Sequence, residues 1–268
     1  MRASTTRSFT PAAVALCVRL RAVREARKIT YRELGARTGI SFAELALYES
    51  GRRAPHVENV ARIIGGLHVG ADEGARLLAL ARQVGLPDFV DADPAVHPAL
   101  LLEYEHRATR ITVWAPEVIP VPLQTADYVG ALGGEDERVV LAASRQHVLS
   151  MRYRVLLGER AVRRLPGGCD VGRGQLRHLL DQAVPICIVP DTVRWPLPAA
   201  FACITLPPER EVVVAEHNRC HAYLTSDSAV THYQHTLASL EEHALPERET
   251  RRLIASHVGA RSRAPARA

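Results

Sequence analysis

Apolar residues recur at helical spacing along the first third of the chain. Between residues 11 and 28 they return every three or four positions among arginines, and similar spacing marks four further stretches before residue 85. The pattern predicts five helices, at residues 11–28, 30–38, 41–49, 55–65 and 72–84. Because such helices have one apolar side, we expect them to pack as an all-α five-helix domain over residues 11–85.

The two short helices in the middle of this domain have strong end signals. Thr30 with Glu33 three residues later forms a capping box, and Ser41 with Glu44 repeats the spacing. Between them, Gly39 can adopt the positive φ that a tight turn requires. Two capped helices around a glycine turn form the outline of a helix-turn-helix, whose second helix enters the major groove of DNA.

Beyond residue 85 the pattern changes. The stretch 86–98 holds three prolines and three aspartates without a helical period, so we expect a linker there. Helices are then expected at residues 99–114, 124–132, 135–151, 172–183, 228–243 and 246–258. Short β-branched or apolar runs predict strands at residues 154–157, 185–189, 201–206, 211–215 and 220–224. We therefore expect an α+β domain over residues 99–258 with a mainly antiparallel sheet, and disordered ends at 1–10 and 259–268.

Charge is distributed unevenly between the two parts. The 268 residues carry a formal net charge of +5. Residues 1–85 hold 14 Arg and Lys against 7 Asp and Glu, whereas the remainder holds 20 against 22. The basic excess therefore belongs to the helical domain, as a surface that binds DNA phosphates requires.

Other sequence features narrow the class of protein. The five cysteines are widely spaced, odd in number and without a CxxC motif, which indicates reduced thiols in a cytoplasm. No apolar run approaches the ~18 residues of a membrane span, so we expect a cytoplasmic protein without membrane contact. The motifs of a P-loop, a GxSxG nucleophile elbow and an HExxH zinc site are all missing, so we expect no enzyme.

Two clusters of polar residues contain side chains that can bind metals or take part in catalysis. His217, Cys220 and His221 are metal-ligand types, but adjacent residues of a strand point to opposite faces, so we expect neither a metal nor a cofactor. Glu103 and Glu105 lie on a predicted helix, where we expect them to be solvated or paired with Arg107.

Three segments within residues 30–55 resemble one known family. Thr-Tyr-Arg-Glu-Leu-Gly, Thr-Gly-Ile-Ser and Tyr-Glu-Ser-Gly-Arg-Arg-Ala-Pro occur here in the order typical of XRE, or lambda-repressor-like, helix-turn-helix domains, and the resemblance covers residues 16–80. It implies that Arg24 on the first helix forms a mostly buried salt bridge with Glu49 at the end of the recognition helix. It also implies the residues that face DNA, which are Thr30, Tyr31, Arg32, Ser41, Phe42, Ala43, Glu44, Leu47, Ser50, Arg52 and Arg53.

The recognition helix is poor in the side chains that commonly read bases. Arg, Asn and Gln make bidentate hydrogen bonds to base edges, whereas this helix offers Phe42, Ala43, Ala46 and Leu47. Apolar groups can contact thymine methyls, and Glu44 can accept a hydrogen bond from cytosine. Salt-dependent phosphate contacts are expected from Arg32, Arg37, Arg52 and Arg53.

A second series of motifs, spread over residues 95–260, resembles the C-terminal domain of actinobacterial helix-turn-helix regulators of the WhiJ-like, antitoxin-like type. The series includes Pro-Val-Pro-Leu-Gln-Thr at 120–125, Gly158-Glu159 and Gln-Leu-Arg-His-Leu at 175–179. This resemblance implies a transcriptional regulator whose C-terminal domain engages a small acidic partner protein.

Together these features predict a homodimeric transcriptional regulator that binds double-stranded DNA, because operators of such domains have two half-sites about one helical turn apart. One alternative is an antitoxin-like adaptor, whose C-terminal domain holds a protein partner while the helical domain binds DNA weakly or without specificity. Another is a small-molecule sensor with an apolar pocket around Trp195 and Phe201.

Overall fold

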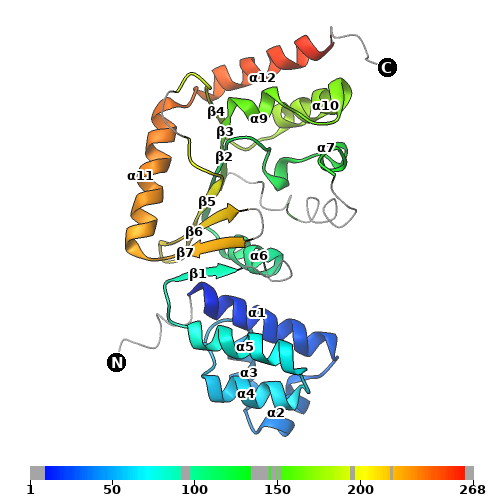
Figure 1. Cartoon of the computed structure of the whole chain (residues 1–268), viewed down its shortest axis with the longest axis vertical. Coiled ribbons are helices and arrows are strands. Elements are labelled where there is room, and N and C mark those ends of the chain that lie inside the picture. The colour runs from blue at the N-terminus through cyan, green and yellow to red at the C-terminus, as the bar shows by residue number, and fades with distance from the viewer. Residues whose placement is uncertain are drawn as a thin grey trace. The chain divides into compact units, whose positions relative to one another are not determined.

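The chain divides into two units in a computed structural model that describes residues 10–91, 97–133, 145, 149, 152–193, 197–217 and 220–262 (Figure 1). The first unit lies within residues 1–104 and 217–229, and the second within residues 105–216 and 230–268. The first unit therefore includes a short segment from late in the sequence, residues 217–229. A single boundary at residues 86–98, as the sequence predicted, would have placed this segment in the second domain.

Five helices form the N-terminal part of the first unit. They are α1 (Pro11–Ala26), α2 (Tyr31–Thr38), α3 (Phe42–Glu49), α4 (Val57–Gly66) and α5 (Ala71–Gln83). Every predicted helix is present, with ends within two residues of the predicted ones. Their apolar sides share one core that includes Leu16 and Leu20 of α1, Leu34 of α2, and Leu45 and Tyr48 of α3.

An ion pair connects α1 to the end of α3. Nε of Arg24 donates to both carboxylate oxygens of Glu49, at 2.8 and 3.0 Å, and Nη2 donates to Oε2 at 2.8 Å. The side chains are only 12% and 4% exposed. Arg24 also donates to the carbonyl of Ile29 at 3.0 Å, and Arg21 donates to the backbone carbonyl of Glu49. The two arginines of α1 thus fix the position of α3.

Part of the expected linker is a strand. Residues Asp88–Asp91 form β1, which pairs antiparallel with β7 (Cys220–Leu224) and places Phe89 opposite Tyr223. The Asp88 carboxylate accepts hydrogen bonds from the amides of Thr225 and Ser226 at 2.9 and 3.0 Å. The expectation of a linker throughout 86–98 was therefore wrong at these four residues, because their pairing partner lies far away in the sequence.

The strands of the second unit form a mixed sheet in the order β6-β5-β2-β3-β4. They are β2 (Arg110–Ala115), β3 (Tyr153–Gly158), β4 (Ile186–Val189), β5 (Phe201–Leu206) and β6 (Arg210–His217). β5 runs antiparallel to β2 and β6, whereas β2, β3 and β4 run parallel. When the antiparallel pair β1–β7 is included, antiparallel strand pairs outnumber parallel ones among the described residues. The expected all-α domain followed by an α+β domain with a mainly antiparallel sheet is confirmed.

One predicted helix was too long. Helix α6 (His97–Arg107) ends before the predicted end at residue 114, and β2 begins at Arg110. The run Ile-Thr-Val-Trp at 111–114 is β-branched and aromatic, which favours a strand. Ile111 and Trp114 are buried in this strand, and the ring nitrogen of Trp114 donates to the carbonyl of Pro198 at 3.0 Å.

Helices cover this sheet, with α11 on one side and α7, α9 and α10 on the other (Figure 1). The helical segments of the unit are η2 (Val121–Leu123), α7 (Ala126–Ala131), α9 (Glu159–Arg163), α10 (Gly168–Asp181), α11 (Asp227–His243) and α12 (Glu247–Ser262). The sequence did not predict α9. Helix α12 continues to Ser262, so the expected disordered tail at 259–268 begins with helix. The predicted helix at 135–151 falls almost wholly outside the described residues. Within the described part of the chain, no helix is long and apolar enough to cross a membrane.

A second buried ion pair lies in this unit. Oε1 of Glu105 accepts a hydrogen bond from Nη2 of Arg145 at 2.5 Å, and Nε of Arg145 lies 3.2 Å from both carboxylate oxygens. Glu105 is buried, so the expectation that it is solvated or paired with Arg107 was wrong. The pKa of the Arg145 guanidinium is raised: burial alone would lower it, but the hydrogen bond to Glu105 and the attraction of that carboxylate outweigh burial.

Replacement of Glu49 by Ala should destabilise the helical domain by about 3 kcal/mol, because the Arg24 charge would remain buried without its partner. Amide hydrogen exchange of the full chain measures this effect by region. Peptides from α1 and α3 should exchange about 100-fold faster, since 1.36 kcal/mol corresponds to a factor of ten. Glu25→Ala is the matched control, because Glu25 contacts the same arginine at 3.3 Å but is 60% exposed. Its cost should be below about 1 kcal/mol, and equal effects of the two variants would contradict a buried pair.

Replacement of Glu105 by Ala should cost about 3–5 kcal/mol in the second unit, for the same physical reason. Urea unfolding followed by tryptophan fluorescence reports on this unit, because Trp114 is fully buried in β2. The control is Glu241→Ala, which removes a partly exposed partner of Arg154 at 2.7 Å and should cost less than about 1 kcal/mol. An unchanged midpoint for Glu105→Ala would refute the role given to this pair.

Candidate nucleic-acid interface

The turn between α2 and α3 is built from caps and glycines. Oγ1 of Thr30 accepts from the amide of Glu33 at 3.2 Å, and the Glu33 carboxylate accepts from the amide of Thr30 at 2.8 Å. Gly39 ends α2 in the left-handed region with φ 68°. A Cβ on Gly35 would lie 2.9 Å from the carbonyl oxygen of Ile40, so α2 approaches the turn closely only because this residue is glycine.

The start of α3 is capped as the sequence predicted. Oγ of Ser41 accepts a hydrogen bond from the amide of Glu44 at 3.2 Å. The hydrogen bonds at Thr30 hold the pKa of the Glu33 carboxyl below its usual value, the backbone donor having the largest effect. Both caps satisfy amides that the first turn of a helix leaves without partners, so the two helices begin at defined residues.

All twelve residues expected to face DNA lie at the surface of the first unit. Three of them, Tyr31, Glu44 and Ser50, are half-buried. The exposed ones are Thr30, Arg32, Arg37, Ser41, Phe42, Ala43, Leu47, Arg52 and Arg53. They come from the two ends of α2, from α3 with its N-cap and from the turn that follows α3.

The exposed side of α3 is apolar. Phe42 in the first turn is 62% exposed and Leu47 is 37% exposed. Ala43 and Leu47 stand four residues apart on the same face of the helix, next to Phe42. We call Phe42, Ala43 and Leu47 the apolar face of α3.

The exposed ring of Phe42 packs against the ring of Tyr31. Its ring meets the ring of Tyr31 edge to face, with centroids 5.6 Å apart and planes at 88°. The Arg24 guanidinium lies 4.3 Å from the centre of the Tyr31 ring. The buried Arg24–Glu49 pair therefore supports the exposed phenylalanine through one intervening ring.

The half-buried Glu44 is held within the protein. Its carboxylate accepts a hydrogen bond from the hydroxyl of Tyr48 at 2.5 Å and lies 3.6 Å from Nη1 of Arg53. Nδ2 of Asn59 donates to the same hydroxyl at 2.7 Å. Burial, followed by the hydrogen bond to Glu44, raises the pKa of Tyr48 to about 12, so the hydroxyl keeps the proton that it donates. Sequence reasoning did not predict this network, although Glu44 and Tyr48 are one helical turn apart.

The four arginines around α3 differ in whether their guanidinium groups already have a partner within the protein. Arg37 donates to the carbonyl of Gly66 at the end of α4 at 3.1 Å, and Arg53 is close to Glu44. Arg32 and Arg52 are exposed and have no ion-pair partner among the described residues. These two are the cations most available to bind phosphate oxygens.

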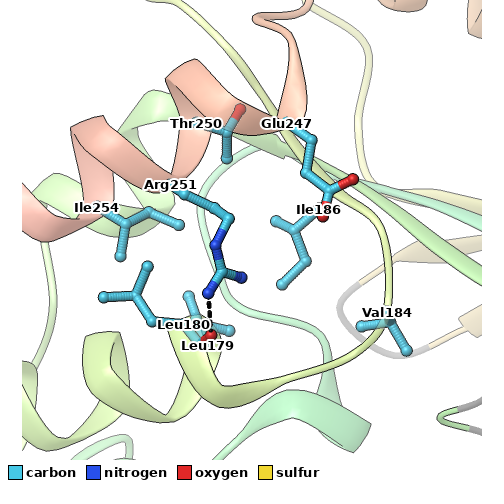
Figure 2. A pocket seen from close by; sticks show the side chains of 8 residues that line it. All are labelled: Leu179, Leu180, Val184, Ile186, Glu247, Thr250, Arg251 and Ile254. Carbon is cyan, nitrogen blue, oxygen red and sulfur yellow. Dashed lines mark hydrogen bonds between the residues drawn. The ribbon is translucent and has the colours of Figure 1, made fainter.

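A pocket of the second unit lies beside α12 and is lined in part by Leu179, Val184, Ile186 and Ile254 (Figure 2). Arg251 reaches across it and donates to the carbonyl of Leu180 at 2.6 Å, which leaves room for no more than one water molecule.

The pocket expected around Trp195 and Phe201 gains no support from the described residues. Trp195 lies outside them, and Phe201 is buried with its ring centroid 4.8 Å from that of Tyr233. Among the side chains that the structure describes, no group of three His, Cys, Asp or Glu residues could hold a metal ion.

Two known families match separate parts of the chain. Residues 20–73 match the family described as Helix-turn-helix (HTH_3), and residues 98–256 match the family described as Domain of unknown function (DUF5753). No curated protein matches the chain. The first match contains the whole of α2 and α3, and the second covers more than half of the 268 residues. The chain therefore belongs to the DUF5753 family and has a helix-turn-helix domain of the XRE type at its N-terminal end.

Proposed function

We propose that this protein is a homodimeric transcriptional regulator that binds double-stranded DNA with α3 in the major groove. The helix-turn-helix match supports a DNA-binding regulator as such. The observation that carries the finer proposal is the surface around α3, where all twelve expected contact residues are accessible and Arg32 and Arg52 have no ion-pair partner within the described chain. DNA lies in the bacterial cytoplasm, so we place the protein there.

The spacing of successive major-groove turns in DNA supports the proposed dimer. One recognition helix covers only one half-site, and a second copy about 34 Å along the duplex would occupy the next turn of the major groove. We place the dimer contacts, and the binding of an effector or of a small acidic protein, in the C-terminal domain. This assignment rests on the resemblance of residues 95–260 to regulators of the WhiJ-like type.

An antitoxin-like adaptor remains the second candidate, and one observation favours it. The exposed Phe42 and Leu47 would also suit a protein partner, because apolar side chains dominate the centres of protein interfaces. In this case DNA binding would be weak and independent of sequence, and the partner would cover the apolar face of α3.

Replacement of Arg52 by Ala should weaken binding to a duplex from the DNA upstream of the protein's own gene. The logarithm of the binding constant falls linearly with the logarithm of salt concentration, with a slope of about 0.9 per neutralised phosphate. The variant should therefore show a slope that is shallower by about one unit in fluorescence anisotropy titrations. This shift should be the same on duplexes of unrelated sequence, because phosphates carry no sequence information.

The matched control is Arg252→Ala on α12, which removes the same charge from an exposed position of the second unit. Its slope should equal that of the unchanged protein. If both variants behave alike, the surface around α3 is not the DNA-binding surface. If the unchanged protein fails to bind any duplex at low salt, the regulator proposal fails and the adaptor becomes the better account.

A further inference from the structure

We propose that α3 reads DNA sequence through the C5-methyl groups of pyrimidines, contacted by Phe42 and Leu47, and not through hydrogen bonds to base edges. The proposal rests on the proposed function, because it assumes that α3 enters the major groove. It adds the chemical group that the protein recognises, which in unmodified DNA is the methyl group of thymine.

The polar side chains of α3 and of its two flanking serines have partners inside the protein. Oγ of Ser41 caps the helix, and Oγ of Ser50 donates to the carbonyl of Leu47 at 3.1 Å. The Glu44 carboxylate is held by Tyr48 and Arg53, and Glu49 is buried against Arg24. Each of these groups is therefore oriented by a partner inside the protein.

The exposed ring of Phe42 is held in place by its neighbours. Phe42 lies in the first turn of α3, the part of a recognition helix that contacts base edges. The ring of Tyr31 supports it at 5.6 Å, and Tyr31 in turn lies against Arg24, which is fixed by Glu49. A braced aromatic ring loses little conformational entropy on binding, so it can discriminate between surfaces that differ by one methyl group.

Positively charged side chains flank the apolar face of α3, as binding to the negatively charged DNA backbone requires. Arg32 and Arg52 are exposed on either side of α3 in the sequence, and the domain as a whole is basic. Phosphates would bind to these cations and orient the helix, whereas the apolar face would meet the floor of the groove. In that groove the thymine methyl is the apolar group, and cytosine, adenine and guanine present only donors and acceptors.

The test compares duplexes that differ only in methyl groups. The probe is the duplex that the full-length protein enriches from a random pool, and each thymine is then replaced in turn by uracil. Burying one methyl group is worth about 0.8 kcal/mol, so each contacted thymine should lose about fourfold in affinity when its methyl is removed. Replacement of cytosine by 5-methylcytosine at a neighbouring position should leave the affinity unchanged or raise it.

Two variants assign the effect to the apolar face of α3. The double variant Phe42→Ala/Leu47→Ala should abolish the difference between the thymine and uracil duplexes, and Phe42→Leu should keep part of it because an apolar contact remains. Val118→Ala is the matched control, since Val118 is 47% exposed and belongs to the second unit. Arg52→Ala should weaken binding to both duplexes by the same factor, because it contacts phosphate.

The outcomes separate this inference from the proposed function. If the protein binds DNA but enriches no sequence, or binds the uracil duplexes as tightly as the thymine duplexes, methyl recognition is wrong while DNA binding stands. If Phe42→Ala/Leu47→Ala keeps the full preference for thymine, another part of the protein reads the methyl groups and the assignment to α3 is wrong. If no duplex is bound at all, the proposed function itself fails.

Discussion

The buried ion pair between Arg24 and Glu49 is the interaction on which the proposed DNA-binding surface depends. It connects α1 to the last residue of α3 through hydrogen bonds of 2.8 to 3.0 Å. A charge pair taken out of water contributes to one defined arrangement only while both partners are present. The same guanidinium lies against Tyr31, which supports Phe42. Arg24 thus helps to fix the position of α3 and also supports its exposed ring through Tyr31.

This arrangement explains why α3 presents an apolar surface. A short helix has few polar side chains, and in α3 they are used to cap the helix, to bind Arg24 and to form the network of Glu44, Tyr48 and Arg53. What remains exposed is Phe42, Ala43 and Leu47. In the proposed complex the exposed arginines would bind the phosphates, and the methyl and ring carbons of the apolar face of α3 would contact the bases.

The sequence predicted the five N-terminal helices well because their signals are local. The capping residues Thr30 and Ser41 and the glycine at position 39 each act within four residues, so the ends of α2 and α3 could be read directly. The pairing of Arg24 with Glu49 came from the resemblance to a family, since no local rule connects residues 25 positions apart. The network around Tyr48 was missed because a tyrosine at a helical core position is read as apolar unless its hydroxyl partner is known.

In the rest of the chain the errors concern contacts between distant residues. Strand β1 was read as linker because its partner β7 lies more than 100 residues later, and Glu105 was read as solvated because Arg145 is 40 residues away. Most of strand β2 was predicted as the end of a helix, although its β-branched residues favour the extended conformation. Local periodicity identifies elements, but it does not say which residues become buried when the elements meet.

The most direct test of the account is a photochemical cross-link between α3 and the base that it reads. In 5-iodouracil an iodine atom occupies the place of the thymine methyl, and irradiation couples the base to an aromatic side chain in contact with it. The account predicts that the cross-linked peptide, identified by mass spectrometry, contains Phe42 and that Phe42→Ala removes the product. A cross-link to a peptide outside residues 30–53, formed with equal yield by the variant, would contradict it.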